Sequence, residues 1–144
     1  MHADAERVPR VLVVDDDEAF RALVRHALEE KGLSVEEAAD GRQALDTLRE
    51  AGRRGEHARF AAVVTDFQMP RMTGLQLVEL LAGAGVAQQT VLLSAFLDRD
   101  SEKWARLLGV GAVLSKPLNF SQLADTVQRV ATTHHAIKPR QTRR

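Results

Sequence analysis

The chain has 144 residues, 44% of them hydrophobic, which is typical of one globular domain and excludes a disordered chain. It contains no cysteine, so disulfides and thiol-based metal sites or catalysis are excluded. Formal net charge is zero, and no apolar run approaches the roughly 18 to 20 residues of a membrane helix, so we expect no membrane association and a cytoplasmic location.

Five short apolar runs predict five strands. The first ten residues, "MHADAERVPR", are polar and carry acids, so they do not look like a secretory signal. Later, "VLVV", "AAVV" and "TVLL" lack polar alternation, which is typical of strands covered on both faces. In chain order the predicted strands are Arg10–Val14, Ser34–Ala38, 61–65, Thr90–Ser94 and Ala112–Ser115.

Helical periodicity lies between and after these runs. The apolar stripe of the first predicted helix consists of Phe20, Leu23, Val24, Ala27 and Leu28. The second predicted helix spans about 41–50 and the fourth about 99–108. Asp40, Thr73 and Asn119 are expected to cap the second, third and fifth helices. Strand and helix therefore alternate five times, which predicts an α/β protein of (βα)5 type, a doubly wound five-stranded parallel sheet with helices on both faces.

Composition along the chain predicts three parts. We expect a flexible N-terminal segment at residues 1–9, one folded domain at 10–133 and a basic tail at 134–144. The tail, "HHAIKPRQTRR", has four Lys or Arg residues and no acid, which leaves sixteen basic against twenty acidic residues for the rest of the chain. Such a tail could contact nucleic acid or an acidic partner. A solvated terminal extension is the simpler interpretation, so we expect no direct nucleic-acid binding.

Polar side chains follow the predicted strands at the points where the strands end. They are Asp15, Asp16, Asp66, Ser94 and Lys116. In an open parallel sheet, ligands bind outside the carboxyl ends of the strands. The fold therefore predicts one small pocket with three carboxylates, one hydroxyl and one ammonium group.

This set of groups suits phosphoryl transfer that depends on a cation. Hard oxygen ligands without His or Cys favour Mg²⁺, which commonly binds one or two carboxylates together with phosphate oxygens. Lys116 and Ser94 could hold the oxygens of an incoming phosphoryl group. Asp66 could itself act as the nucleophile and form an acyl phosphate.

Four stretches together resemble the receiver domain of two-component response regulators, which has a flavodoxin-like fold. They are "VLVVDDDEAFR", "VVTDFQMPRMTG", "VLLSAF" and "VLSKPL", and the resemblance covers roughly residues 10–132. It implies that Asp66 accepts a phosphoryl group from a phosphohistidine of a sensor histidine kinase or a histidine phosphotransfer protein. It also implies a Mg²⁺ site formed by Asp16 directly, Asp15 mainly through water, Asp66, and the backbone carbonyl of Gln68.

The same resemblance implies the remaining parts of a phosphorylation switch. Lys116 would pair with the phosphoryl oxygens, Ser94 would move toward them, and the Lys116–Pro117 bond would be cis. The expected contact face spans residues 99–130, through which phosphorylation would alter binding of a downstream protein or formation of a homodimer. The protein would catalyse only its own phosphorylation and dephosphorylation, and so would not be an enzyme in the usual sense.

Two features depart from the family pattern or modify it. Val113 occupies a position where receivers commonly carry Tyr or Phe, so coupling through an inward-turning ring is in doubt. Gln68 and Phe96 border the expected path of the hydrolytic water. Because Phe96 is bulky and apolar, we expect slow loss of the phosphoryl group.

Two alternatives remain at this point. A phosphohydrolase of the haloacid dehalogenase type would use Asp15 as nucleophile and Asp17 as acid and base, but no acidic pair follows Lys116 and Asp66 would have no role. The other alternative is a receiver-shaped module that no longer takes phosphate. Such modules usually lose an acid or the lysine, and both are present here.

Overall fold

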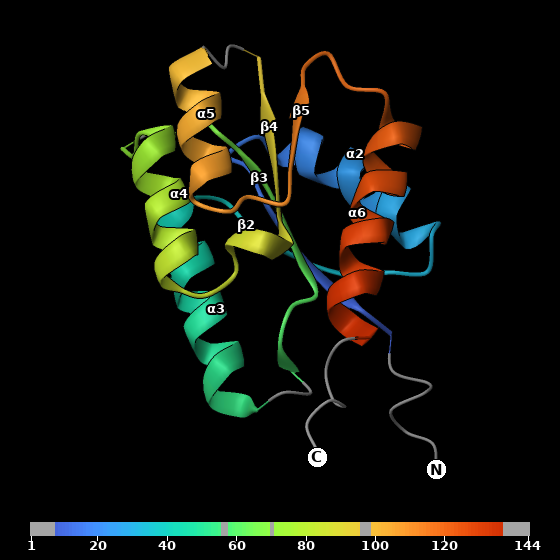
Figure 1. Cartoon of the computed structure of the whole chain (residues 1–144). Coiled ribbons are helices and arrows are strands. Elements are labelled where there is room, and N and C mark those ends of the chain that lie inside the picture. The colour runs from blue at the N-terminus through green and yellow to red at the C-terminus, as the bar shows by residue number, and fades with distance from the viewer. Residues whose placement is uncertain (1–7, 56–57, 70, 96–98, 137–144) are drawn as a thin grey trace.

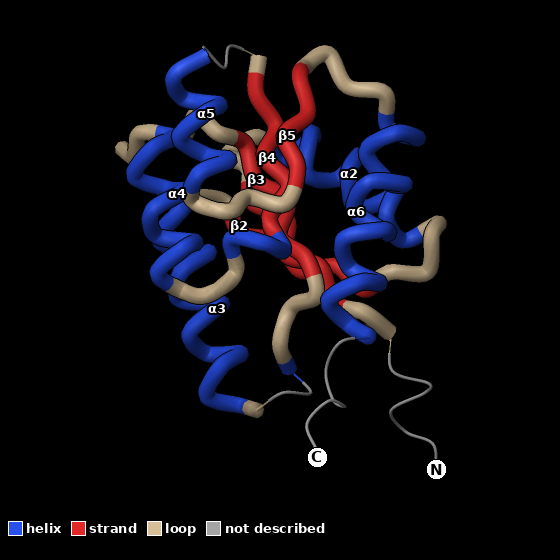
Figure 2. The backbone as a smooth tube through the Cα atoms, viewed as in Figure 1, coloured by secondary structure: helices blue, strands red, loops and turns tan. Residues whose placement is uncertain are grey.

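The computed structural model describes residues 8–55, 58–69, 71–95 and 99–136. All strand pairs in these ranges are parallel, and the sheet order is β2-β1-β3-β4-β5. Figure 2 shows the sheet as a twisted central layer between helices. The strands are β1 (Arg10–Val14), β2 (Ser34–Ala38), β3 (Ala62–Asp66), β4 (Thr90–Ser94) and β5 (Ala112–Ser115). The predicted fold class is thus confirmed, with β3 shifted by one residue so that Asp66 ends it.

Within the described part of the chain, five α-helices cover the sheet. They are α2 (Glu18–Glu29), α3 (Gly41–Arg54), α4 (Gly74–Gly83), α5 (Arg99–Leu107) and α6 (Phe120–Ala136). Figure 1 shows α2 and α6 on one face of the sheet and α3, α4 and α5 on the other. None of the helices in the described ranges is long and apolar enough to span a lipid bilayer.

The boundaries of some helices differ from those predicted. Helix α3 continues to Arg54 instead of ending near residue 50, because its buried face continues through Ala51, which packs with Ala58 and Phe60 in the core. Helix α6 runs to Ala136, past the boundary at residue 133 that the sequence predicts for the folded part. A 3₁₀ helix, η2 (Ala87–Gln89), precedes β4 and was not predicted.

The predicted caps are present in the structure. Asp40 accepts a hydrogen bond from the Gln43 backbone N–H at 2.8 Å, and Asn119 accepts one from the Gln122 backbone N–H at 3.0 Å. Thr73 forms a reciprocal capping box at the start of α4. These side chains satisfy backbone donors that would otherwise lack partners, which fixes where each helix begins.

The central strands have no polar alternation because both of their faces are covered. In β1, Val11 and Val13 pack in the core beneath α2 and α6, whereas Leu12 and Val14 pack in the core beneath α3 and α4. All four side chains are at most 1% exposed. Strand β1 is therefore held between two hydrophobic layers, and its register places the residue that follows it, Asp15, beside the end of β2.

Candidate functional site

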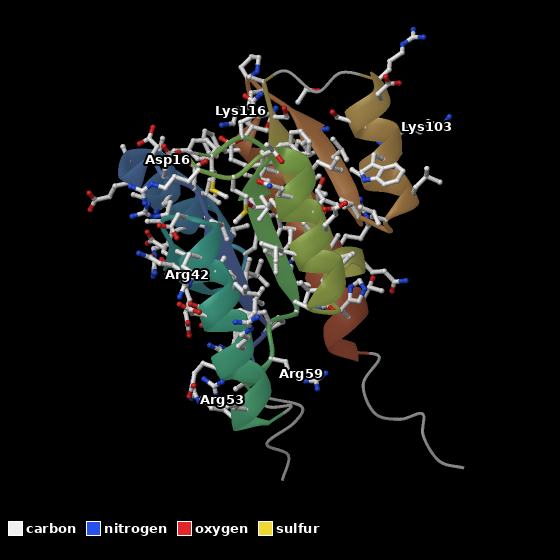
Figure 3. The ribbon with its side chains drawn as sticks, turned by 90° about the vertical axis from the view of Figure 1, so that its left-hand side faces the viewer. Asp16, Arg42, Arg53, Arg59, Lys103 and Lys116 are labelled. Atoms are coloured by element: carbon white, nitrogen blue, oxygen red, sulfur yellow. The ribbon has the colours of Figure 1, made fainter. Side chains whose placement is uncertain are left out.

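The carboxyl ends of the strands form one edge of the sheet, and the predicted polar residues meet there. Strand β1 leads directly into Asp15, β3 ends with Asp66, β4 ends with Ser94, and β5 leads into Lys116. Figure 3 shows Lys116 near the upper end of the molecule and Asp16 beside the upper part of the ribbon, far from Arg53 at the lower end.

Asp66 and Lys116 form an ion pair across this edge. The distance from Lys116 Nζ to Asp66 Oδ2 is 2.9 Å, and the two side chains are 27% and 13% exposed respectively. The backbone N–H of Gln68 donates to Asp66 Oδ1 at 2.9 Å. Both carboxylate oxygens of Asp66 therefore have a donor, which orients this side chain at the mouth of the site.

Two further contacts position Lys116. Its backbone N–H donates to the carbonyl oxygen of Ser94 at 2.8 Å, in register with the pairing of β4 and β5. Its Nζ lies 4.6 Å from the centre of the Phe20 ring, within the range of a cation–π interaction. The Phe20 ring in turn contacts Phe120, with ring centres 6.0 Å apart. The Lys116–Pro117 bond is cis, as the resemblance implies.

Asp15 is almost fully buried, with 2% of its surface exposed. Its Oδ1 accepts a hydrogen bond from the Asp17 backbone N–H at 2.8 Å, whereas its Oδ2 is buried and has no hydrogen-bond partner. Burial, together with the nearby carboxylates of Asp66 and Asp16, raises the pKa of Asp15 to about 6 against the opposing effects of the Asp17 N–H and the Lys116 ammonium. A buried carboxylate oxygen without a donor is costly unless a cation approaches it.

The donor set fits Mg²⁺. Among the described residues, no three acidic or histidine side chains are gathered tightly enough to form a metal cage by themselves. Mg²⁺ commonly keeps several water ligands and uses only one or two carboxylates, so a loose set of oxygens is what it requires. The partnerless Oδ2 of Asp15 and the exposed carboxylate of Asp16 lie on one loop and provide such oxygens.

One residue that supports the site was missed in the sequence. The side chain of Arg21, on the first turns of α2, donates from Nη1 to the carbonyl oxygen of Asp15 at 2.6 Å and from Nε to Glu37 at 2.8 Å. The hydrogen bond from Arg21, and a second one from Arg25, lower the pKa of Glu37 although its burial opposes this. Arg21 lies outside the apolar stripe of α2, and nothing in the spacing of residues indicated which loop it would contact.

The other predicted residues are placed as follows. Ser94 is 2% exposed at the end of β4, and Gln68 is exposed after β3. Val113 is partly buried and packs against the cluster of Phe67 and Leu92 between the sheet and α5. Phe96 lies outside the described residues, so slow loss of a phosphoryl group stays a prediction.

Comparison with known proteins identifies the family. The family model described as "Response regulator receiver domain" matches residues 11–128. Over 115 residues the chain is 41% identical to the response regulator MprA of Mycolicibacterium vanbaalenii, which covers 79% of this chain and 46% of that protein. Over 124 residues it is 35% identical to the alkaline phosphatase synthesis transcriptional regulatory protein SphR of Synechococcus elongatus, with 83% and 47% covered. The chain thus spans about half the length of these curated relatives.

Solved structures agree with this assignment. The chemotaxis protein CheY4 of Vibrio cholerae superposes with a TM-score of 0.71 at 32% identity, covering 85% of this chain and 98% of that one. A CheY-like receiver domain from Methanospirillum hungatei has a TM-score of 0.76 at 23% identity, which supports the fold alone.

The chain belongs to the response regulator receiver domain family, and it is a receiver domain of the two-component signalling type. This family is generally a signalling domain and not a classical enzyme. These comparisons do not favour the haloacid dehalogenase alternative.

Proposed function

We propose that Asp66 accepts a phosphoryl group from a phosphohistidine of a sensor histidine kinase or a histidine phosphotransfer protein. The observation that carries this proposal is the placement of the Asp66 carboxylate between the Lys116 ammonium and the Gln68 N–H, near enough to the buried Asp15 carboxylate to raise its pKa. In the transfer, an Asp66 oxygen forms a bond to phosphorus while the phosphorus–nitrogen bond breaks. The imidazole leaves with that electron pair.

Several residues of this chain would have separate roles in phosphoryl transfer. Lys116, already 2.9 Å from Asp66, would hold a phosphoryl oxygen by a charge-assisted hydrogen bond, and the hydroxyl of Ser94 would hold another. Asp16, Asp66 and the carbonyl of Gln68 would hold Mg²⁺ directly, and Asp15 would hold it mainly through water. Bound there, the ion would neutralise charge on the phosphoryl oxygens. Transfer then depends mainly on in-line positioning and charge neutralisation, both of which these residues provide.

The output of the domain is proposed to be a change in protein contact at residues 99–130, which include α5, β5 and α6 as far as Val130. Two apolar side chains of α5 in this range are exposed, Trp104 at 43% and Leu107 at 68%. A downstream protein or a second copy of the chain would bind more tightly after phosphorylation. Partner affinity measured with and without beryllofluoride tests this, and equal affinities would contradict it.

A cytoplasmic location stays a prediction.

Phosphorylation of Asp66 can be tested directly with a small-molecule donor. We expect acetyl phosphate with Mg²⁺ to add one phosphoryl group, about 80 Da, to the intact protein, and Asp66→Asn to abolish the adduct. Intact and peptide mass spectrometry measure the adduct and its position. Asp46→Asn is the matched control, because Asp46 is an exposed carboxylate of α3 and should leave the adduct unchanged.

Two results would contradict this proposal. The first is an adduct on another residue or no adduct in the parent protein, which would favour a receiver-shaped module without phosphate chemistry. The second is sustained hydrolysis of a generic phosphate ester, which would favour a hydrolase.

A further inference from the structure

We propose that Arg21 is a positioning residue that holds residues 15–17, here called the acidic loop, in the conformation that binds a divalent cation. The inference rests on the proposed function, since it concerns the same Mg²⁺ site. It assigns a specific structural task to a side chain that touches neither the phosphoryl group nor the cation.

The backbone of Asp15 is held from both sides. Its N–H donates to the carbonyl oxygen of Ala38 at 3.1 Å, and its own carbonyl oxygen accepts from Arg21 Nη1 at 2.6 Å. Arg21 is itself fixed by Glu37, the residue next to Ala38 in β2. The end of β2 therefore positions Asp15 twice, once directly and once through Arg21.

The acidic loop needs such support because its carboxylates repel one another. Asp15, Asp16 and Asp17 are consecutive acids, and Asp15 is buried with one carboxylate oxygen that has no hydrogen-bond partner. Without the Arg21 bond, the Asp15 carbonyl would lose its donor and the loop could relax so that these carboxylates separate. The oxygens would then no longer converge on one cation.

Whether Mg²⁺ affinity rises or falls when Arg21 is replaced distinguishes a positioning role of Arg21 from a purely electrostatic one. Arg21 is a cation near a cation site, so removing its charge alone would strengthen Mg²⁺ binding. Loss of positioning would weaken it. Weaker binding in a variant that lacks Arg21 is therefore specific to the proposed role.

The helix offers a matched control in Arg25. Arg25 Nε donates to the same Glu37 at 2.7 Å, but its other partner is Glu29 on α2, at 3.0 Å from Nη1. Its side chain is 37% exposed, against 14% for Arg21. Arg25→Ala thus removes a cation from the same ion cluster, and among the described residues the hydrogen bonds of Arg25 go to Glu37 and Glu29 instead of the acidic loop.

The experiment measures Mg²⁺ affinity of the whole chain from amide chemical shifts of the acidic loop. We expect Arg21→Ala to weaken binding roughly five- to tenfold, within the net range of one lost intramolecular hydrogen bond. Arg25→Ala should stay within about twofold of the parent, and Arg21→Lys should recover part of the loss because it can still donate to the Asp15 carbonyl. In metal-free protein, the Asp17 amide, which donates to Asp15 Oδ1, should exchange faster in Arg21→Ala alone.

The outcomes are distinguishable. If the parent protein binds no Mg²⁺, the proposed function fails. If the parent binds it and Arg21→Ala binds equally well or better, the positioning role is wrong. Equal weakening in Arg21→Ala and Arg25→Ala would also overturn it, since the effect would then come from the Glu37 ion cluster as a whole. Should Arg21→Ala not fold, Arg21→Gln provides the same comparison.

Discussion

Asp15→Asn is expected to stabilise the metal-free protein at pH 7 and to abolish its stabilisation by Mg²⁺. In the parent, the Asp15 carboxylate is buried with one oxygen unpartnered and with Asp66 and Asp16 nearby. An amide of the same shape removes that charge. It also keeps an oxygen that can accept the hydrogen bond of the Asp17 N–H. Without metal, the substitution therefore removes the unfavourable burial of a charge. With metal, it removes a group that helps to hold the ion.

The size of the effect follows from proton linkage. Burial raises the pKa of Asp15 from 3.8 to about 6, so between these values the folded state binds more protons than the unfolded state. The stability contributed by this residue therefore falls as pH rises from about 4 to 6 and stays low above it. The full pKa shift corresponds to about 3 kcal/mol in the free energy of unfolding. Solvent near the edge of the sheet reduces this value. We therefore expect Asp15→Asn to raise the free energy of unfolding by roughly 1–2 kcal/mol at pH 7.

Chemical denaturation at pH 4 and pH 7, with and without Mg²⁺, measures this. The gain of Asp15→Asn should be present at pH 7 and much smaller at pH 4, where Asp15 is protonated in the folded state and only partly ionised in the unfolded state. Asp16→Asn is the control: its side chain is exposed, so it should lose the response to Mg²⁺ without the gain in metal-free stability. A loss of stability at pH 7 in Asp15→Asn would show that the charge of Asp15 is already compensated within the chain.

The sheet and the composition of the site could be predicted because both depend on short local signals. Continuous apolar runs such as "VLVV" mark strands buried on both faces, and the polar residue after each run marks the ligand edge. Asp66 and Lys116 are fifty residues apart in sequence, yet parallel pairing of β3, β4 and β5 brings them into contact. The order of the parallel strands was therefore sufficient to predict that Asp66 and Lys116 lie close together.

The supporting contacts could not be predicted, since they depend on how α2 is rotated against the sheet. Phe20 fits the apolar stripe of α2, but the sequence does not indicate that its ring faces Lys116 instead of packing wholly in the core. Likewise, Arg21 reaches the Asp15 carbonyl only because Glu37 at the end of β2 holds it there. Side-chain pairs between elements that are distant in sequence leave no periodic signal.

Lys116→Met is expected to have opposite effects on cation binding and on phosphorylation. The Lys116 ammonium is 2.9 Å from Asp66 Oδ2, and its positive charge lowers the pKa of Asp15. It therefore competes with a divalent cation for the same carboxylates. Removing it should strengthen Mg²⁺ binding roughly fivefold, about 1 kcal/mol, as expected for two charges that are strongly screened by water.

Phosphorylation should respond in the other direction, because Lys116 is the residue proposed to hold a phosphoryl oxygen. We expect the rate of adduct formation with acetyl phosphate to fall at least about tenfold in Lys116→Met at saturating Mg²⁺, consistent with the loss of a charge-assisted hydrogen bond in the transition state. Lys103→Met provides the control, since Lys103 is an exposed lysine of α5, away from the site (Figure 3), and should change neither quantity. Weaker Mg²⁺ binding in Lys116→Met would instead show that the ammonium orients Asp66 for the cation and does not compete with it.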